Sequence, residues 1–164
     1  MTRTAFDDRV AANYDDGRQF AADGLPVAAA PAQSTCFVVD DDAGICKALC
    51  FTLKKLGFAT AEIATPAALE RALQEKRPSL ILLDLGLGES GALDVFPILT
   101  SHGYRGLVQL MSGRSQSVLD EAVVAGEKHG LKMLPALVKP FRMGVVKELV
   151  AGLGFPPPAG TAAA

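Results

Sequence analysis

The stretch Leu80-Ile81-Leu82-Leu83-Asp84 places four aliphatic side chains in a row and ends them on an aspartate. A strand with one buried face alternates apolar and polar residues, whereas a parallel strand buried on both faces is apolar throughout. The stretch therefore predicts a central strand of a parallel sheet, covered by helices on both sides, with Asp84 at its carboxyl end.

Three further apolar runs also end on polar residues that can take part in chemistry. They are Phe37-Val38-Val39 before Asp40, Asp41 and Asp42, then Leu107–Met111 before Ser112, and Ala136-Leu137-Val138 before Lys139 and Pro140. If all four runs are parallel strands, their carboxyl ends lie at one edge of the sheet, where open α/β sheets build their sites. We therefore expect three carboxylates, a hydroxyl and an ammonium group to converge there.

Helical patterns lie between the strands. Strands are expected at Phe37–Val39, Phe58–Ile63, Leu80–Leu83, Leu107–Met111 and Leu134–Val138, and helices at Ile45–Leu56, from Thr65-Pro66, at Ala92–Ser101, Ser117–His129 and Met143–Leu153. Pro97 is expected to remove a hydrogen bond inside its helix, and Ser117 to open its helix with a pattern like a capping box. Five βα units predict a doubly wound α/β fold, a five-stranded parallel sheet with helices on both faces.

The composition is that of an ordinary globular domain. Of 164 residues, 49% are hydrophobic and 21% are charged, and the net charge of −2 provides no basic field that would favour nucleic acid. Residues 1–34 hold five aspartates and three arginines and are expected to be a mostly disordered extension. The domain is expected over residues 35–153, and residues 154–164, rich in proline and alanine, are expected to form a tail.

The three cysteines, Cys36, Cys46 and Cys50, form no CxxC pair and are interpreted as small core residues. This cysteine usage predicts a cytoplasmic protein. No apolar segment follows Met1 as in a signal peptide, and no apolar run approaches the roughly 18 residues of a membrane span, so neither is expected.

The residues expected at the sheet edge suit phosphoryl chemistry. Asp40, Asp41 and Asp84 cannot all stay ionised within a few ångströms unless a cation neutralises them. Carboxylate oxygens in a small acidic pocket favour Mg²⁺, which leaves coordination positions for phosphate oxygens. Lys139 and Ser112 can bind further phosphoryl oxygens, and a carboxylate such as Asp84 can itself be the nucleophile, giving an acyl phosphate.

Asp40-Asp41, Asp84, Ser112 and Lys139-Pro140-Phe141, in this order on successive βα units, resemble the signature residues of receiver domains of two-component response regulators. The resemblance covers about residues 35–153. It implies a flavodoxin-like sheet with the strand order 2-1-3-4-5. It also implies signalling rather than enzymatic turnover, with phosphorylation and dephosphorylation of the domain itself.

The resemblance implies a role for each residue of this set. Asp84 would accept the phosphoryl group from a phosphohistidine of a histidine kinase or a histidine phosphotransfer protein. Asp41, Asp84 and the backbone carbonyl of Gly86 would bind Mg²⁺ directly, and Asp40 would bind it through a water. Ser112 and Lys139 would bind the phosphoryl oxygens, and the bond from Lys139 to Pro140 would be cis.

The sequence departs from the receiver pattern in three places. Gly88 stands where the family often has proline, and Ala136 stands where it usually has an aromatic residue that rotates on activation. Lys139 follows Ser112 by 27 residues, which predicts an extended fourth helix or exit loop. The sequence around Asp84 and Ser112 is similar to that of receivers attached to cyclic-di-GMP phosphodiesterase domains. No such output domain is present in the sequence, so we expect a single-domain receiver.

Such a receiver would signal by binding a partner through its fourth helix, fifth strand and fifth helix, without direct contact with nucleic acid or membrane. Two other functions stay open at this stage. A Mg²⁺-dependent phosphohydrolase with an aspartyl nucleophile would use the pair Asp40 and Asp42, and a receiver-like scaffold would not be phosphorylated at all. Asp42 can also be a helix N-cap, and His102 and His129, each before a glycine, fit helix C-termini.

Overall fold

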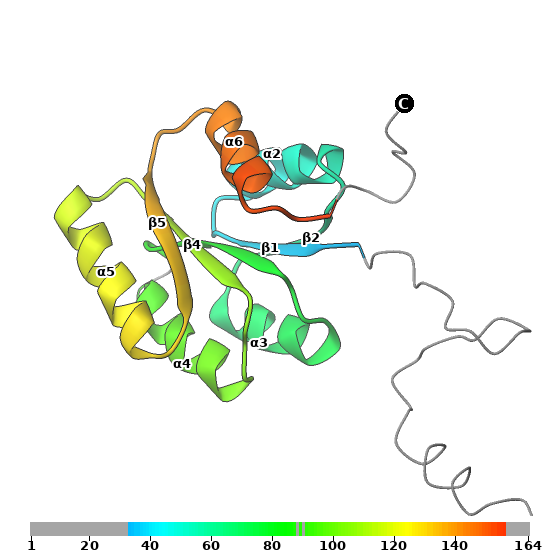
Figure 1. The fold of residues 1–164 in the computed structure, drawn as a ribbon. Coiled ribbons are helices and arrows are strands. Elements are labelled where there is room, and N and C mark those ends of the chain that lie inside the picture. The colour runs from blue at the N-terminus through cyan, green and yellow to red at the C-terminus, as the bar shows by residue number, and fades with distance from the viewer. Residues whose placement is uncertain (1–32, 88, 90, 157–164) are drawn as a thin grey trace, which may run out of the picture. The chain divides into compact units, whose positions relative to one another are not determined.

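The computed structural model describes residues 33–156 except 88 and 90 (Figure 1). The strands are β1 (Thr35–Val39), β2 (Ala59–Ile63), β3 (Leu80–Asp84), β4 (Leu107–Ser112) and β5 (Lys132–Val138). The helices are α2 (Ala43–Lys55), α3 (Pro66–Glu75), the 3₁₀ turn η1 (Ala92–Asp94), α4 (Val95–Ser101), α5 (Gln116–Lys128) and α6 (Met143–Gly152). Strands and helices therefore alternate as the sequence predicts.

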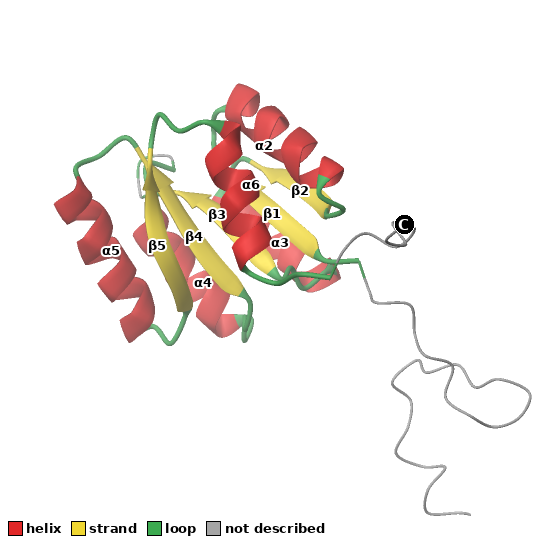
Figure 2. Cartoon of the chain, turned by 45° about the horizontal axis from the view of Figure 1, so that its top comes forward, coloured by secondary structure: helices red, strands yellow, loops and turns green. Residues whose placement is uncertain are grey.

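All five strands are parallel, in the order β2-β1-β3-β4-β5. Helices α2 and α6 cover one face, and α3, α4 and α5 cover the other (Figures 1 and 2). The predicted doubly wound sheet and its strand order are confirmed. Because the order reverses at β1, the carboxyl ends of β1 and β3 lie next to each other, which is where such sheets bind ligands.

Strand β3 is the centre of two cores. All five of its residues are buried. Leu80 and Leu82 pack into the core under α2 and α6, and Ile81 and Leu83 pack into the core under α3, α4 and α5. The unbroken apolar run is thus explained by burial on both faces, as predicted, and it fixes Asp84 at the carboxyl edge.

The ends of two helices follow local signals in the sequence. Asp42 caps α2, and its Oδ1 accepts hydrogen bonds from the amides of Gly44 at 2.8 Å and Ile45 at 3.1 Å. Thr65 caps α3 in the same way and accepts from Ala68 N at 3.2 Å, with Pro66 at the first helical position. Both residues supply acceptors for amides that have no partner within the helix.

Two predicted helix details are wrong. The segment from Ala92 begins as a 3₁₀ turn and the α-helix starts only at Val95. Pro97 therefore lies in the first turn, where an amide would have no intrahelical partner, and its ring removes no hydrogen bond. Helix α5 starts at Gln116 rather than Ser117, and its N-cap Ser115 makes no side-chain capping bond. Asp120 instead accepts from Gln116 Nε2 at 2.8 Å, which takes the place of the predicted capping box.

The cysteines and histidines have the structural roles expected of them. Cys36, Cys46 and Cys50 are free and buried, and burial raises the pKa of the Cys46 thiol to about 11. His102 and His129 are the C-cap residues of α4 and α5. No helix among the described residues is long and apolar enough to cross a membrane. The predicted extension 1–34 and tail 154–164 lie largely outside the described residues, and their boundaries stay predictions.

Candidate functional site

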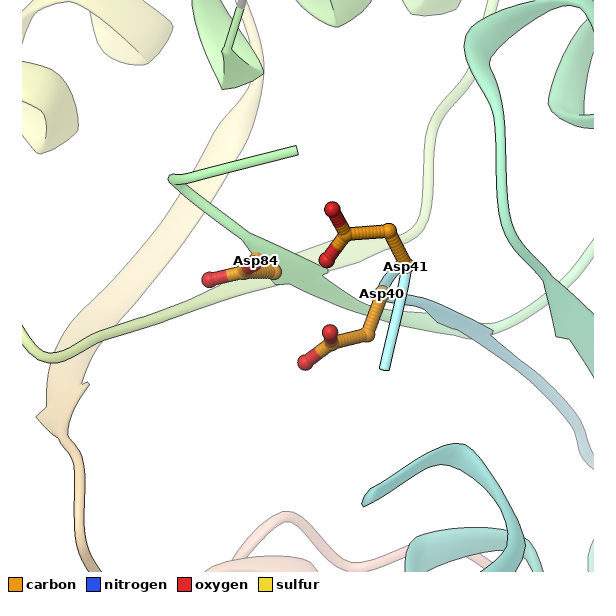
Figure 3. A group of neighbouring side chains, drawn as sticks. All are labelled: Asp40, Asp41 and Asp84. Carbon is orange, nitrogen blue, oxygen red and sulfur yellow. The ribbon is translucent and has the colours of Figure 1, made fainter. Parts of the chain in front are cut away.

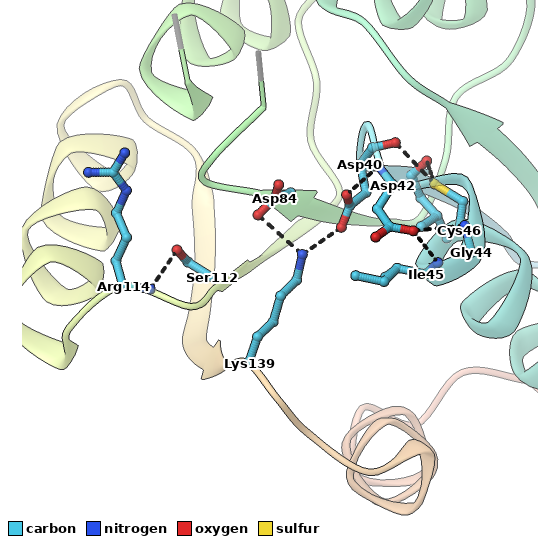
Figure 4. A network of polar contacts seen from close by, with 10 residues as sticks. Asp40, Asp42, Gly44, Ile45, Cys46, Asp84, Ser112, Arg114 and Lys139 are labelled. Atoms are coloured by element: carbon cyan, nitrogen blue, oxygen red, sulfur yellow. Dashed lines mark hydrogen bonds and ion pairs between the residues drawn. The ribbon is translucent and has the colours of Figure 1, made fainter. Parts of the chain in front are cut away.

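The carboxyl ends of β1, β3, β4 and β5 bring four of the predicted site residues to one place (Figure 4). Asp40 follows β1, Asp84 and Ser112 end β3 and β4, and Lys139 follows β5. Asp40 is 1% exposed, Ser112 is 2% exposed and Asp84 is 8% exposed. Buried polar groups of this kind are retained where they have partners or a ligand to bind.

Three carboxylates lie together at the ends of β1 and β3 (Figure 3). Asp40, Asp41 and Asp84 each offer an oxygen, and these oxygens all lie within 4.8 Å of one another. Asp41 is exposed, whereas Asp40 and Asp84 are buried. A small, all-oxygen set that is open to water on one side fits the ligand chemistry of Mg²⁺, which keeps several waters of its own.

Lys139 reaches into this acidic group. Its Nζ lies 2.6 Å from Asp40 Oδ2 and 3.3 Å from Asp84 Oδ1 (Figure 4). Burial by itself would lower the pKa of Lys139, but the hydrogen bonds and negative charges of Asp40 and Asp84 outweigh burial and raise this pKa. The side chain therefore stays a cation and offsets part of the negative charge of the site.

Asp40 is held in place by the backbone that follows it. The amide of Asp42 donates to Asp40 Oδ1 over 2.9 Å, which leaves Oδ2 for Lys139. Sequence reasoning did not find this role of the Asp42 amide, although the signal lies in the run of three aspartates, because a short acidic side chain often accepts from the amide two residues on.

Ser112 lies at the same edge but on the side of Arg114. Its Oγ accepts a hydrogen bond from Arg114 N at 3.1 Å, so its own proton is free to be donated. The carbonyl of Ser112 accepts from the amide of Lys139 at 2.7 Å, which ties the ends of β4 and β5 together. Within the described part of the chain, the hydroxyl makes no hydrogen bond to Asp84 or Lys139.

The remaining predicted residues have clear positions. Gly86 lies beside the carboxylate of Asp84, since a Cβ built on it would be 3.5 Å from Asp84 Oδ2. The peptide bond between Lys139 and Pro140 is cis, as predicted. Ala136 is half-buried on β5. Gly88 lies outside the described residues.

The sequence matches the family profile of the response regulator receiver domain over residues 36–151. The chain belongs to the response regulator receiver family. Two-component signalling is therefore the process in which this receiver takes part.

Among curated relatives, the receiver is 36% identical over 114 residues to the DNA-binding response regulator MtrA of Mycobacterium tuberculosis. The match covers 70% of this chain and 46% of MtrA, so the chain spans about half the length of this relative. It is likewise 36% identical to MtrA of Mycolicibacterium paratuberculosis, with 70% and 47% of the two chains covered.

Solved structures share the fold. The chemotaxis protein CheY4 of Vibrio cholerae superposes with a TM-score of 0.64 at 18% identity, covering 74% of this chain and 98% of CheY4. A response regulator from Burkholderia pseudomallei, determined with a phosphorylated aspartic acid and a calcium ion, superposes with a TM-score of 0.57 at 18% identity, covering 74% and 73%. At these identities the likeness shows the fold alone.

Proposed function

We propose that this receiver accepts a phosphoryl group onto Asp84 from a phosphohistidine, with Mg²⁺ bound directly by Asp41, Asp84 and the carbonyl of Gly86 and through a water by Asp40. The partner that brings the phosphohistidine is a histidine kinase or a histidine phosphotransfer protein. The phosphorylated domain then signals by binding another protein and turns over no external substrate. A cytoplasmic location stays a prediction.

One observation carries the proposal: Asp84 lies 3.3 Å from the ammonium of Lys139, within a group of three carboxylates, at the end of the central strand. A salt bridge alone needs one carboxylate. Three carboxylates and one lysine leave an excess of negative charge, which favours a divalent cation. With such a cation, the site combines a nucleophile with the positive charges that phosphoryl transfer needs.

In the proposed reaction, an oxygen of Asp84 forms a bond to phosphorus while the bond from phosphorus to the donor's imidazole nitrogen breaks. The electron pair of the broken bond stays on the imidazole. Lys139 moves its contact from Asp84 to an oxygen of the transferred group, and the hydroxyl of Ser112 donates to another. The chemistry that Mg²⁺ supplies when bound is neutralisation of charge on the carboxylates and phosphoryl oxygens.

A surface next to Lys139 fits the donor protein. Ile45, Pro140, Phe141 and Met143 line, together with Lys139, a hollow of about 330 Å³. These apolar side chains come from the start of α2, from the chain between β5 and α6, and from the first residue of α6. An apolar rim beside a charged reaction centre is suited to a helix that carries a histidine, because the rim binds the helix while the charges bind its phosphoryl group.

The output surface is proposed to be formed by α5, β5 and α6. Val124, Val138 and Val145 are 46%, 44% and 39% exposed on these three elements. Exposed valines on adjacent elements provide apolar contact area for a partner protein. Ala136, half-buried on β5, has no ring that could rotate, so the signal is proposed to run through Ser112 and the loop that follows it.

The phosphohydrolase alternative is not proposed. It depended on Asp42 acting beside Asp40, and the carboxylate of Asp42 caps helix α2 instead.

Intact-protein mass spectrometry tests the proposal. The full chain is incubated with phosphoramidate in the presence and absence of Mg²⁺. We expect an adduct with the mass of one phosphoryl group that requires Mg²⁺ and is lost in Asp84→Asn. Asp94→Asn, an exposed aspartate on η1, is the matched control and should be phosphorylated normally. An adduct that persists in Asp84→Asn, or a folded protein that forms none, would contradict the proposal.

A further inference from the structure

Strand β5 has one residue more than the neighbouring strand β4 in the stretch that leads to the carboxyl edge of the sheet. Gln109 pairs with Leu134 and Met111 pairs with Leu137, so three steps along β5 lie opposite two steps along β4. This is a β-bulge, which bends a strand and changes the direction of the side chains that follow it. The extra residue falls at Pro135-Ala136.

The bulge decides which residue reaches the carboxylates. Beyond it, Ser112 pairs with Val138, and the amide of Lys139 donates to the carbonyl of Ser112. A regular ladder continued from Gln109 and Leu134 would pair Ser112 with Leu137. Val138 would then take the place of Lys139, and Lys139 would lie about 3.3 Å further along and on the opposite face.

Gln109 is the side chain that holds the bulge. It is fully buried, at 0% exposure, in the middle of β4. Its Nε2 donates to the carbonyl of Pro135 at 2.6 Å and to that of Leu110 at 3.1 Å. Pro135 has no amide proton, so only its carbonyl can bond to the neighbouring strand, and the side-chain amide of Gln109 supplies the donor for that carbonyl.

Packing alone does not call for a polar residue at this position. Leu107 and Met111, two residues before and after Gln109, pack with the core under α2 and α6, and alternation along the strand directs Gln109 to the same face. Across the described residues, Gln109 Oε1 has no hydrogen-bond partner. A buried, unpaired amide oxygen is unfavourable, so the role of this side chain lies in its donor, which reaches Pro135.

We propose that Gln109 is a positioning residue for Lys139: by binding the carbonyl of Pro135 it holds the bulge that brings the lysine to Asp40 and Asp84. Gln109 touches none of the reacting groups. The inference rests on the proposed function, in which Lys139 binds the transferred phosphoryl group.

Two variants of the full chain test this role. Gln109→Met keeps the length of the side chain but has no donor, and it is expected to slow the phosphorylation of Asp84 by phosphoramidate about tenfold or more. Deletion of Pro135 in the same variant pairs Leu134, Ala136 and Leu137 with positions 109, 110 and 111 in a regular ladder. This double variant is expected to return to within about threefold of the wild-type rate, because Lys139 regains its place.

The double variant distinguishes a positioning role from a contribution to stability. If Gln109 only stabilised the fold, deletion of Pro135 from the neighbouring strand would not restore the rate of phosphorylation. Thr60→Val, on the opposite edge strand β2, is the matched control and should leave the rate unchanged. Gln109→Leu replaces Gln109→Met if the methionine variant does not fold. A wild-type rate in the single variant, or an equally slow double variant, would overturn the role.

Crystal structures of the single and double variants give a readout that does not depend on phosphorylation. The ion pair between Lys139 and Asp40 is expected to be absent in Gln109→Met and present again after deletion of Pro135. An intact ion pair in the single variant would refute the positioning role. Failure of the wild-type protein to form an adduct would instead refute the proposed function.

Discussion

Replacement of Lys139 by methionine is expected to destabilise the magnesium-free protein by about 2–3 kcal/mol. The lysine lies 2.6 Å from Asp40, which is 1% exposed, and 3.3 Å from Asp84. Loss of one partner of a fully buried pair costs about 3–5 kcal/mol because a buried charge is left uncompensated. The side chain of Lys139 is 19% exposed, so water screens part of the interaction and the expected loss is reduced to about 2–3 kcal/mol.

Urea unfolding at pH 7, with and without Mg²⁺, measures this effect. The difference between wild type and Lys139→Met should shrink when Mg²⁺ is added, because a bound cation takes over the neutralisation of the carboxylates. Lys132→Met is the matched control, since Lys132 is an exposed lysine at the start of β5, the strand that Lys139 follows, and its substitution should change stability by less than about 0.5 kcal/mol. A loss below about 1 kcal/mol for Lys139→Met, or one that Mg²⁺ does not reduce, would refute the reasoning.

Three further predictions follow from the site. Mg²⁺ at 100 times its Kd is expected to stabilise the wild-type protein by about 2.7 kcal/mol and so to raise its Tm. Asp41→Asn is expected to remove most of this rise in Tm, and a rise as large as in the wild type would exclude Asp41 as a ligand. Asp42→Ala is expected to lower the free energy of unfolding by about 1 kcal/mol through loss of the α2 cap, measured by urea unfolding; an unchanged value would contradict that cap. Because the folded state raises the pKa of Lys139, its stabilising contribution is complete below the ordinary lysine value of about 10.4 and is lost as pH rises through the higher folded value. The stability difference between wild type and Lys139→Met should therefore narrow above that pH, and a difference that widens would contradict the ion pairs.

The residues at the carboxyl edge could be predicted from sequence because each follows an apolar run directly. In a parallel sheet, the end of a strand fixes the place of the next residue, so Asp40, Asp84 and Ser112 converge at this edge, and Lys139 joins them once the register of β5 is set. Central strand β3 was the strongest signal, since burial on both faces leaves no polar position before Asp84.

The details that sequence reasoning missed depend on contacts between elements. Pro135 is a sequence signal for an edge strand or a bulge, but the register of β5 is set by a side chain of β4, which no pattern within residues 132–138 reveals. The predicted roles of Pro97 and Ser117 were wrong because both helices start at other residues than expected. The first residue of a helix determines which amides lack a partner within it. Gln109 was visible as a polar residue within an apolar run, but its partner, the carbonyl of Pro135, is 26 residues away in the chain.

Locating the phosphoryl group on the chain tests the central proposal most directly. The full chain is treated with phosphoramidate and Mg²⁺, then with borohydride, which reduces an acyl phosphate to an alcohol, and its peptides are analysed by mass spectrometry. The proposal predicts homoserine at position 84 and at no other aspartate. Reduction at Asp40 or Asp41, or an adduct on a histidine, would contradict it.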